Sequence, residues 1–140
     1  MSDAKDVKDV IVIAEDSPPN RKILAHLLEK MGFEVLAFEN GQVTWEALRQ
    51  MPPEKHVIAV ISDIMMPAMD GLELLKSIRQ DKTLKALPVV LVTAVSDKDH
   101  IVQAKALHVN GYILKPVTFQ RVADKLHELF PDKTFTKPAA

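Results

Sequence analysis

The sequence predicts an α/β domain built on a doubly wound parallel sheet of five strands flanked by five helices. Short runs rich in β-branched residues alternate with longer stretches in which apolar residues recur every three or four positions, which is typical of repeated β-α units. Several of the short runs are apolar throughout, as strands covered on both faces are. At 140 residues the chain has the size of one domain.

The first unit pairs a strand over about 10–14 with a helix that begins after Ser17. Ser17 suits the N-cap, and Pro18 and Pro19 are tolerated in the first turn, where an amide N–H has no partner within the helix. Gly32 is expected to end this helix. Its predicted core-facing stripe consists of Ile23, Leu24, Leu27, Leu28 and Met31.

The second strand, about 33–38, has apolar residues at alternate positions, 33, 35 and 37, and is expected at a sheet edge. Asn40 and Gly41 turn the chain into the second helix, which Pro52 and Pro53 stop. The predicted inward face of that helix consists of Thr44, Trp45 and Leu48.

The third strand covers about 57–62 and places Asp63 at its tip. A helix follows from the expected N-cap Asp70 to about Gln80. The N-cap role is preferred to a catalytic role for Asp70. The apolar positions of this helix are Leu72, Leu74, Leu75 and Ile78.

Pro88 opens the fourth strand, about 89–93, and the helix near 97–107 follows it. The apolar stripe of that helix is weaker than those of its neighbours, which predicts looser packing and more freedom to shift. Gly111 precedes the fifth strand, about 112–114. The last helix ends before Pro131 and buries Phe119, Val122, Ala123, Leu126, Leu129 and Phe130.

Composition excludes several function classes. The chain has no cysteine, which excludes a disulfide framework and thiol catalysis, and its five histidines show no metal-ligand spacing. The net charge of −1 comes without a basic stripe, so we expect no nucleic-acid partner and no binding to an anionic membrane. The polar start of the chain and the lack of a long apolar stretch predict a cytoplasmic protein.

Polar residues follow four of the predicted strands at the point where each ends. Glu15 and Asp16 follow the first, Asp63 the third, Thr93 ends the fourth, and Lys115 follows the fifth. Right-handed crossovers and fully apolar runs place the first, third and fourth strands in the sheet centre, with the first and third adjacent. Ligands bind at the carboxyl ends of such strands, where the winding reverses. The sequence therefore predicts one site that suits Mg²⁺ and a phosphoryl group.

The chemistry of this residue set favours phosphorylation of an aspartate. Three nearby carboxylates repel one another, and a divalent cation with a preference for oxygen ligands relieves the repulsion. Asp63 is the preferred nucleophile because it lies at the tip of a central strand, opposite Glu15 and Asp16, which would ligate the metal. Lys115 and Thr93 could bind phosphoryl oxygens. Ser62 is a poor rival because no base lies near its hydroxyl.

Four motifs in this order resemble the receiver domain of two-component response regulators, as found in single-domain chemotaxis regulators. The resemblance spans about 9–130. The motifs are Glu15-Asp16-Ser17-Pro18, then Asp63-Ile64-Met65-Met66-Pro67-Ala68-Met69-Asp70-Gly71, then Thr93-Ala94, and finally Tyr112-Ile113-Leu114-Lys115-Pro116. The resemblance implies a flavodoxin-like fold with strand order 2-1-3-4-5. We expect the receiver domain to cover 9–131, between flexible ends at 1–8 and 132–140.

The resemblance also implies roles for individual residues. Asp63 would accept phosphate from a histidine kinase or a histidine phosphotransfer protein. Asp16 and Asp63 would bind Mg²⁺ directly, Glu15 would act mainly through water, and the main-chain carbonyl of Met65 would be a further ligand. Glu15 departs from the aspartate that is commoner in the family, a change that we expect the family to tolerate.

Thr93 and Tyr112 match the switch pair of the family, in which the hydroxyl moves to the phosphoryl group and the ring swings inward. Lys115-Pro116 resembles the family's lysine followed by a cis-proline. Core packing is the expected role of Trp45.

The expected function is that of a stand-alone, phosphorylation-activated regulator that acts on a downstream effector protein, without turnover of an external substrate. The output would pass through the face formed by the fourth helix, the fifth strand and the fifth helix. Two alternatives are a receiver-like interaction module that is never phosphorylated and an aspartyl-phosphate phosphatase. The phosphatase is disfavoured because haloacid-dehalogenase relatives carry Asp-x-Asp after the first strand.

The lifetime of the phosphorylated state is a further expectation. Water that attacks the phospho-aspartate needs orienting groups, and Met65 and Val95, which occupy the relevant positions by resemblance, are apolar. We therefore expect slow self-dephosphorylation.

Overall fold

Five parallel strands form one sheet in the computed structural model, which describes residues 8–94 and 97–133. The strands are β1 (Val10–Ala14), β2 (Glu34–Phe38), β3 (Val57–Asp63), β4 (Val89–Thr93) and β5 (Gly111–Leu114). Their order across the sheet is β2-β1-β3-β4-β5, so the predicted order is confirmed. The flexible ends expected at 1–8 and 132–140 lie outside the described residues, except for Lys8, Asp132 and Lys133.

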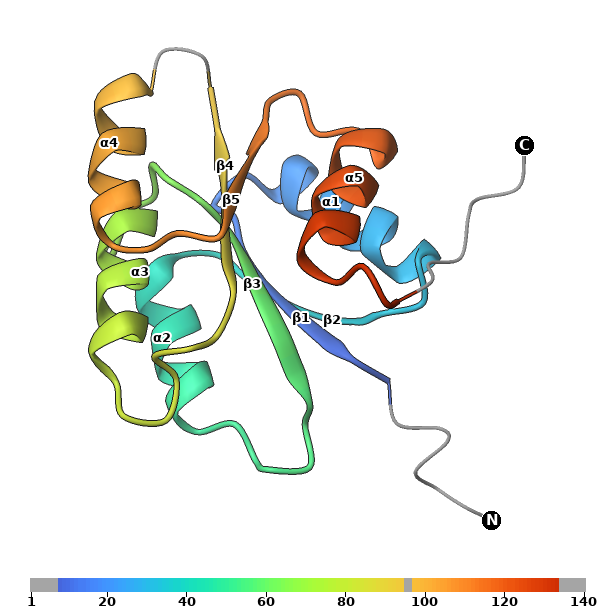
Figure 1. The fold of residues 1–140 in the computed structure, drawn as a ribbon, viewed down its shortest axis with the longest axis horizontal. Helices are drawn as coiled ribbons and strands as arrows, with labels where there is room; N and C mark the ends of the chain where they lie inside the picture. The colour runs from blue at the N-terminus through green and yellow to red at the C-terminus, as the bar shows by residue number, and fades with distance from the viewer. Residues whose placement is uncertain (1–7, 95–96, 134–140) are drawn as a thin grey trace.

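Helices cover both faces of the sheet. They are α1 (Pro18–Lys30), α2 (Gly41–Arg49), α3 (Gly71–Gln80), α4 (Lys98–Ala106) and α5 (Phe119–Leu129). Figure 1 shows α1 and α5 on one face and α2, α3 and α4 on the other. Each face has its own core, since Ile11 and Ile13 pack with α1 and α5 whereas Val10 and Val12 pack toward α2 and α3. This double burial explains why the central strands are apolar throughout.

Two residues of the predicted apolar patterns face solvent. Ile23 was expected in the core stripe of α1, but its side chain is 51% exposed, whereas Leu24 and Leu28 are buried. Consecutive helical residues point roughly 100° apart, so a stripe centred on Leu24 and Leu28 leaves Ile23 at its margin. In β2, Ala37 is exposed and its neighbours are half-buried, because an edge strand is covered incompletely.

The helix α4 is held to the core by few side chains. Ala104 is its one buried residue, and Val102 is 68% exposed. The predicted weakness of its apolar face is therefore confirmed, while its greater freedom to shift stays a prediction. Among the helices within residues 8–94 and 97–133, none is long and apolar enough to span a bilayer.

Candidate functional site

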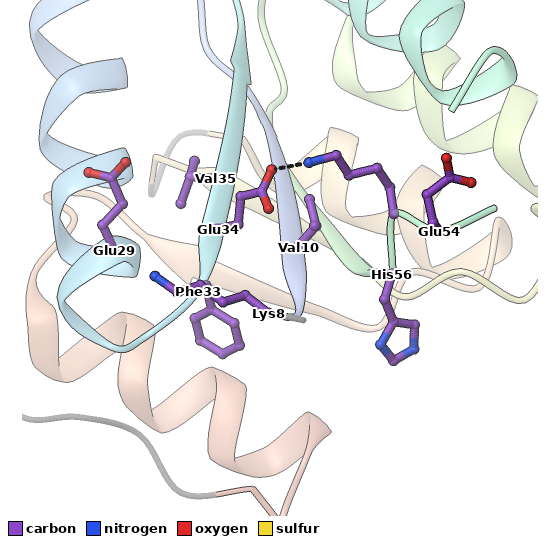
Figure 2. A pocket seen from close by; sticks show the side chains of 9 residues that line it. Lys8, Val10, Glu29, Phe33, Glu34, Val35, Glu54 and His56 are labelled. Carbon is purple, nitrogen blue, oxygen red and sulfur yellow. Dashed lines mark hydrogen bonds and ion pairs between the residues drawn. The ribbon is translucent and has the colours of Figure 1, made fainter. Parts of the chain in front are cut away.

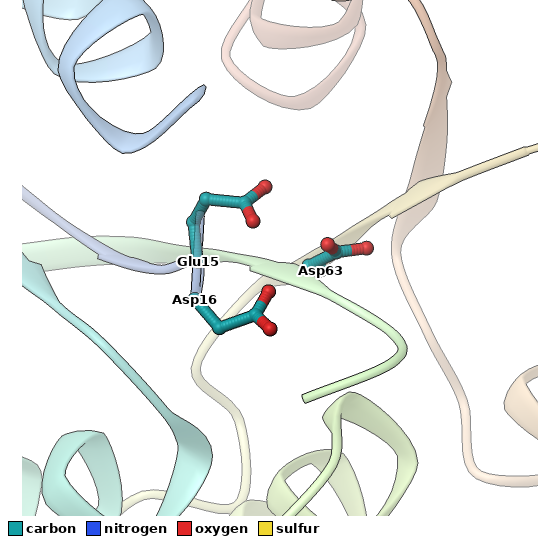
Figure 3. A group of neighbouring side chains, drawn as sticks. All are labelled: Glu15, Asp16 and Asp63. Atoms are coloured by element: carbon teal, nitrogen blue, oxygen red, sulfur yellow. The ribbon is translucent and has the colours of Figure 1, made fainter. Parts of the chain in front are cut away.

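Three carboxylates from two neighbouring strand ends lie together (Figure 3). In the β1-β3 pair Ala14 lies opposite Ser62, which brings the residues that follow β1 next to Asp63. One carboxylate oxygen from each of Glu15, Asp16 and Asp63 lies within 4.8 Å of the others. Glu15 and Asp63 are buried and Asp16 is exposed. The prediction that these acids meet is confirmed.

The carboxylate of Asp63 is held from two sides. The Ile64 N–H donates to its Oδ1 at 2.9 Å. Lys115 Nζ lies 3.2 Å from Oδ2 and also 3.2 Å from Oδ1. Lys115 therefore reaches from the end of β5 past β4 to the acid at the tip of β3. The Lys115–Pro116 peptide is cis, as the resemblance implied.

Glu15 is fixed by local hydrogen bonds, and its pKa is raised. The Ser17 N–H donates to Glu15 Oε2 at 3.0 Å, and Arg21 Nη1 donates to the Glu15 main-chain carbonyl at 2.9 Å. Burial raises the pKa of Glu15 to about 7; the Ser17 hydrogen bond opposes this rise, and the nearby Asp63 carboxylate adds to it. Burial therefore makes the ionised form of Glu15 less favourable than in water, and the Asp63 carboxylate adds to this effect.

Thr93 and Tyr112 share the face of the sheet that α4 covers. The Thr93 side chain is fully buried, and its hydroxyl has no hydrogen-bond partner among the described residues. Val92 packs in the α1-α5 core, so the next residue, Thr93, points to the opposite face. Tyr112 packs against the core on that face, and burial raises the pKa of its phenol. The expected switch residues therefore lie on the α4 side, one of them with an unused hydroxyl.

Gly71 supports the backbone that carries Asp63, a structural role that the sequence reasoning did not assign to it. A Cβ at Gly71 would lie 2.3 Å from the Asp63 carbonyl oxygen, and the Gly71 N–H donates to the Ile64 carbonyl at 2.7 Å. The start of α3 thus packs directly on the backbone that carries Asp63. Asp70 caps α3 in a reciprocal capping box with Glu73, which confirms its predicted role as N-cap. The Asp70-Gly71 pair was the available signal for this close approach.

Three other sequence expectations concern the same end of the sheet. The Ser62 hydroxyl donates to the Asp63 carbonyl at 2.8 Å, and its rejection as a rival nucleophile stays a prediction. The Met65 side chain is 60% exposed beside Asp63, and its role as a carbonyl ligand stays a prediction. Val95 lies outside the described residues.

Two hollows lie at opposite ends of the strands. A pocket of about 440 Å³ adjoins the acidic site and is lined by Glu15, Asn20, Ile23, Leu24, Val92, Lys115, Pro116 and Val117. Another, of about 760 Å³, lies where β1 and β2 begin and includes Val10, Glu34 and His56 (Figure 2). In that second pocket Lys55 Nζ forms an ion pair with Glu34 Oε2 at 2.6 Å. The second pocket is remote from the strand ends that carry Glu15, Asp16 and Asp63.

The acidic cluster fits a magnesium ion. Its donors are carboxylate oxygens, which Mg²⁺ prefers to nitrogen or sulfur ligands. Burial, and to a smaller degree the Asp63 carboxylate, raises the pKa of Glu15, and a divalent cation nearby would favour the ionised form of this side chain. Asp16 is exposed, which leaves room for water molecules that Mg²⁺ keeps in its coordination sphere.

Fold and site together define a class: a doubly wound α/β protein with an acidic pocket at the carboxyl ends of its central strands. Comparison with known families identifies the family within this class. The chain belongs to the family described as "Response regulator receiver domain", which it matches over residues 11–127. The expected membership is confirmed, and it places the protein in two-component signalling.

Relatives of similar length support the assignment. The chain is 38% identical over 122 residues to "Chemotaxis protein CheY-3" of Vibrio cholerae, covering 86% of this chain and 90% of that one. It is 37% identical over 120 residues to "Chemotaxis protein CheY" of Pseudomonas aeruginosa, covering 86% and 94%.

Solved structures share the fold. The signal receiver domain of a histidine kinase from Syntrophus aciditrophicus has a TM-score of 0.77 and 29% identity, covering 94% of this chain and 98% of that one. The response regulator CheY4 of Vibrio cholerae has a TM-score of 0.78 at 23% identity, covering 87% and 98%. At 23% identity, the similarity to CheY4 concerns the fold alone.

Proposed function

We propose that the protein is a stand-alone response regulator in which Asp63 accepts a phosphoryl group from a histidine kinase or a histidine phosphotransfer protein. One observation carries the proposal. Asp63 is only 6% exposed, yet its carboxylate lies close to the carboxylates of Glu15 and Asp16 and 3.2 Å from the Lys115 ammonium. A structural ion pair would not require the additional acids. This chain is similar to two chemotaxis proteins, and the similarity covers 90% and 94% of their lengths. This similarity supports action without an attached effector domain.

The transfer step needs little covalent work from the protein. A carboxylate oxygen of Asp63 attacks the phosphorus of a phosphohistidine, the P–N bond breaks, and the released imidazole nitrogen takes a proton. The Ile64 N–H, which donates to Oδ1, orients the nucleophile. Lys115 Nζ and the unused Thr93 hydroxyl are available to phosphoryl oxygens.

Magnesium would be held by Asp16, Asp63 and the main-chain carbonyl of Met65, with Glu15 acting through water. When bound, Mg²⁺ would neutralise part of the phosphoryl charge and align its oxygens. Arg21 and the Ser17 amide keep Glu15 in place for this role, because they hold its carbonyl and its carboxylate respectively.

The donor protein would dock on α1 beside the acidic site. Ile23 is 51% exposed there and lines the 440 Å³ pocket together with Asn20 and Pro116. An exposed apolar side chain next to polar groups is typical of the centre of a protein interface. Pro18 and Asn20 at the start of α1 would take part in the same contact, whereas the Arg21 guanidinium is engaged with the Glu15 carbonyl.

The output would pass through the face formed by α4, β5 and α5. Thr93 and Tyr112 point to the side of the sheet that α4 covers, so movement of the Thr93 hydroxyl toward a phosphoryl group would change the packing beneath α4. Val102 and Leu114, 68% and 41% exposed, supply apolar contact area on this face for an effector.

The phosphorylated state is proposed to be long-lived, because the Met65 side chain beside Asp63 cannot orient an attacking water by hydrogen bonding. The double variant Met65→Asn with Val95→Glu should lose phosphate faster than the wild type in the presence of Mg²⁺. Equal rates would contradict this part of the proposal.

The central test is treatment of the full chain with acetyl phosphate and Mg²⁺, followed by intact-mass measurement. We expect the wild type to gain one phosphoryl group, Asp63→Asn to gain none, and the exposed control Asp99→Asn to behave as the wild type. A label retained by Asp63→Asn would refute the acceptor assignment. No label on any of the three would favour the interaction module that is never phosphorylated, and steady hydrolysis of generic phosphate esters would favour the phosphatase.

A further inference from the structure

The N-cap of α4 differs from the N-caps of the other helices. The other four N-cap residues have extended backbones, and the side chain of each accepts an N–H from the first turn of its own helix. They are Ser17, Asn40, Asp70 and Thr118. Asp97 has φ −90° and ψ 31° instead, and its side chain makes no capping hydrogen bond to α4 within the described part of the chain. A good capping residue is therefore not used for capping.

The carboxylate of Asp97 is engaged elsewhere. Its Oδ2 accepts the Ala94 N–H at 2.8 Å, and its Oδ1 lies 3.7 Å from His100 Nδ1. The side chain of Asp97 is 19% exposed, so this is a partly sheltered, charge-assisted hydrogen bond. Ala94 directly follows Thr93, the last residue of β4.

The Ala94 N–H points toward the strand that carries Asp63. The carbonyl of the same peptide group, that of Thr93, accepts the Lys115 N–H at 2.8 Å and so faces β5. The C=O and N–H of a trans peptide point in opposite directions. Because β4 lies between β3 and β5, the Ala94 N–H faces β3, at whose tip Asp63 lies.

We propose that the Asp97 carboxylate is an internal competitor of the phosphoryl group, holding the Ala94 N–H while Asp63 is unmodified and releasing it when a phosphoryl oxygen takes that donor. The inference rests on the proposed function, since it requires a phosphoryl group on Asp63. A single N–H cannot serve both anions at full strength, and the charge of nearly −2 on the phosphoryl group also repels the carboxylate.

Release of Asp97 has a consequence for α4. The freed carboxylate can accept the N–H of His100, the third residue of the helix, which is the arrangement that the other four helices already have. Phosphorylation would thus exchange a contact at the end of β4 for a cap on α4. This links chemistry at Asp63 to the first turn of the helix that contributes to the output face.

The test is the affinity of the full chain for beryllofluoride, a phosphoryl analogue, in the presence of Mg²⁺. Removing the competitor in Asp97→Ala should tighten binding by about five-fold, the difference expected between a free donor and one engaged with a charged acceptor. Asp97→Asn keeps the shape of the side chain but makes its acceptor oxygen neutral. It should raise the affinity for beryllofluoride by less than Asp97→Ala does. Asp99→Asn, the same charge change at an exposed position of the same helical turn, should bind as the wild type.

A spectroscopic readout separates competition from a merely structural role of Asp97. In the wild type, beryllofluoride should shift the amide resonance of His100 as it gains the cap, and this shift should be absent in Asp97→Ala. If the wild type binds and Asp97→Ala binds equally or more weakly, Asp97 only closes the local turn and the inference is wrong while the proposed function stands. If the wild type does not bind at all, the proposed function fails and this inference fails with it.

Discussion

Glu15 should make the protein less stable as the pH rises above about 5 when no Mg²⁺ is present. Its pKa is raised from 4.5 to about 7 in the folded protein, chiefly by burial. Between these two values the folded state binds more protons than the unfolded state, so the free energy of unfolding falls as the pH rises through this window. Once Glu15 is fully ionised, the loss amounts to roughly 3 kcal/mol.

The variant Glu15→Gln isolates this effect. Glutamine is neutral at every pH, and its side-chain carbonyl can still accept the Ser17 N–H that Glu15 accepts at 3.0 Å. We expect the variant to match the wild type near pH ~4 and to exceed its free energy of unfolding by roughly 3 kcal/mol near pH ~8. Urea unfolding in the presence of a chelator measures both values.

Two controls accompany this measurement. Glu128→Gln removes a carboxylate whose side chain is 66% exposed and should leave the pH dependence of the wild type unchanged. Adding Mg²⁺ should reduce the advantage of Glu15→Gln, because the cation offsets the charge of the native Glu15. A difference between Glu15→Gln and the wild type that is the same at both pH values would refute the argument from burial and charge.

Three further predictions concern other positions. Gly71→Ala places a Cβ 2.3 Å from the Asp63 carbonyl and should lower the free energy of unfolding by about 1–3 kcal/mol, measured with urea, and reduce phosphate uptake. Arg79→Ala removes two hydrogen bonds to the His108 carbonyl and should speed hydrogen exchange around that loop, with little effect on β1. Ile23→Ser should slow transfer from the donor protein but leave labelling by acetyl phosphate unchanged.

The strand-end site could be predicted from sequence because it depends on topology. Fully apolar runs fix β1 and β3 as central neighbours, and the residues after them must then meet at one edge of the sheet. Gly71 could not be found in this way. Its importance comes from the path of the loop that returns α3 onto the Asp63 carbonyl, and periodicity contains no information about that path.

Helix rules also fail where two local donors compete for one acceptor. The residue type of Asp97 predicts an N-cap, and the helix does begin immediately after it. The carboxylate nevertheless accepts the Ala94 N–H rather than an N–H of α4. Both donors are within a few residues of Asp97 in the sequence, so only the three-dimensional direction of the peptide after Thr93 decides between them.

The two ends of α4 are held by different means, and this determines where a signal from Asp63 can act. Beyond the carboxyl end, the Arg79 guanidinium donates to the His108 carbonyl at 2.9 Å and to Asn110 Oδ1 at 2.7 Å. Asn110 Oδ1 also accepts the Val89 N–H, which ties this end to β4. At the amino end the corresponding tie is the hydrogen bond from the Ala94 N–H to the Asp97 carboxylate, for which a phosphoryl group on Asp63 would compete. Displacement of the Asp97 carboxylate would loosen this end of α4, where the Asp97 N–H still donates to the Ala94 carbonyl at 3.1 Å, while the other end stays anchored. This arrangement favours a tilt of α4 over its detachment.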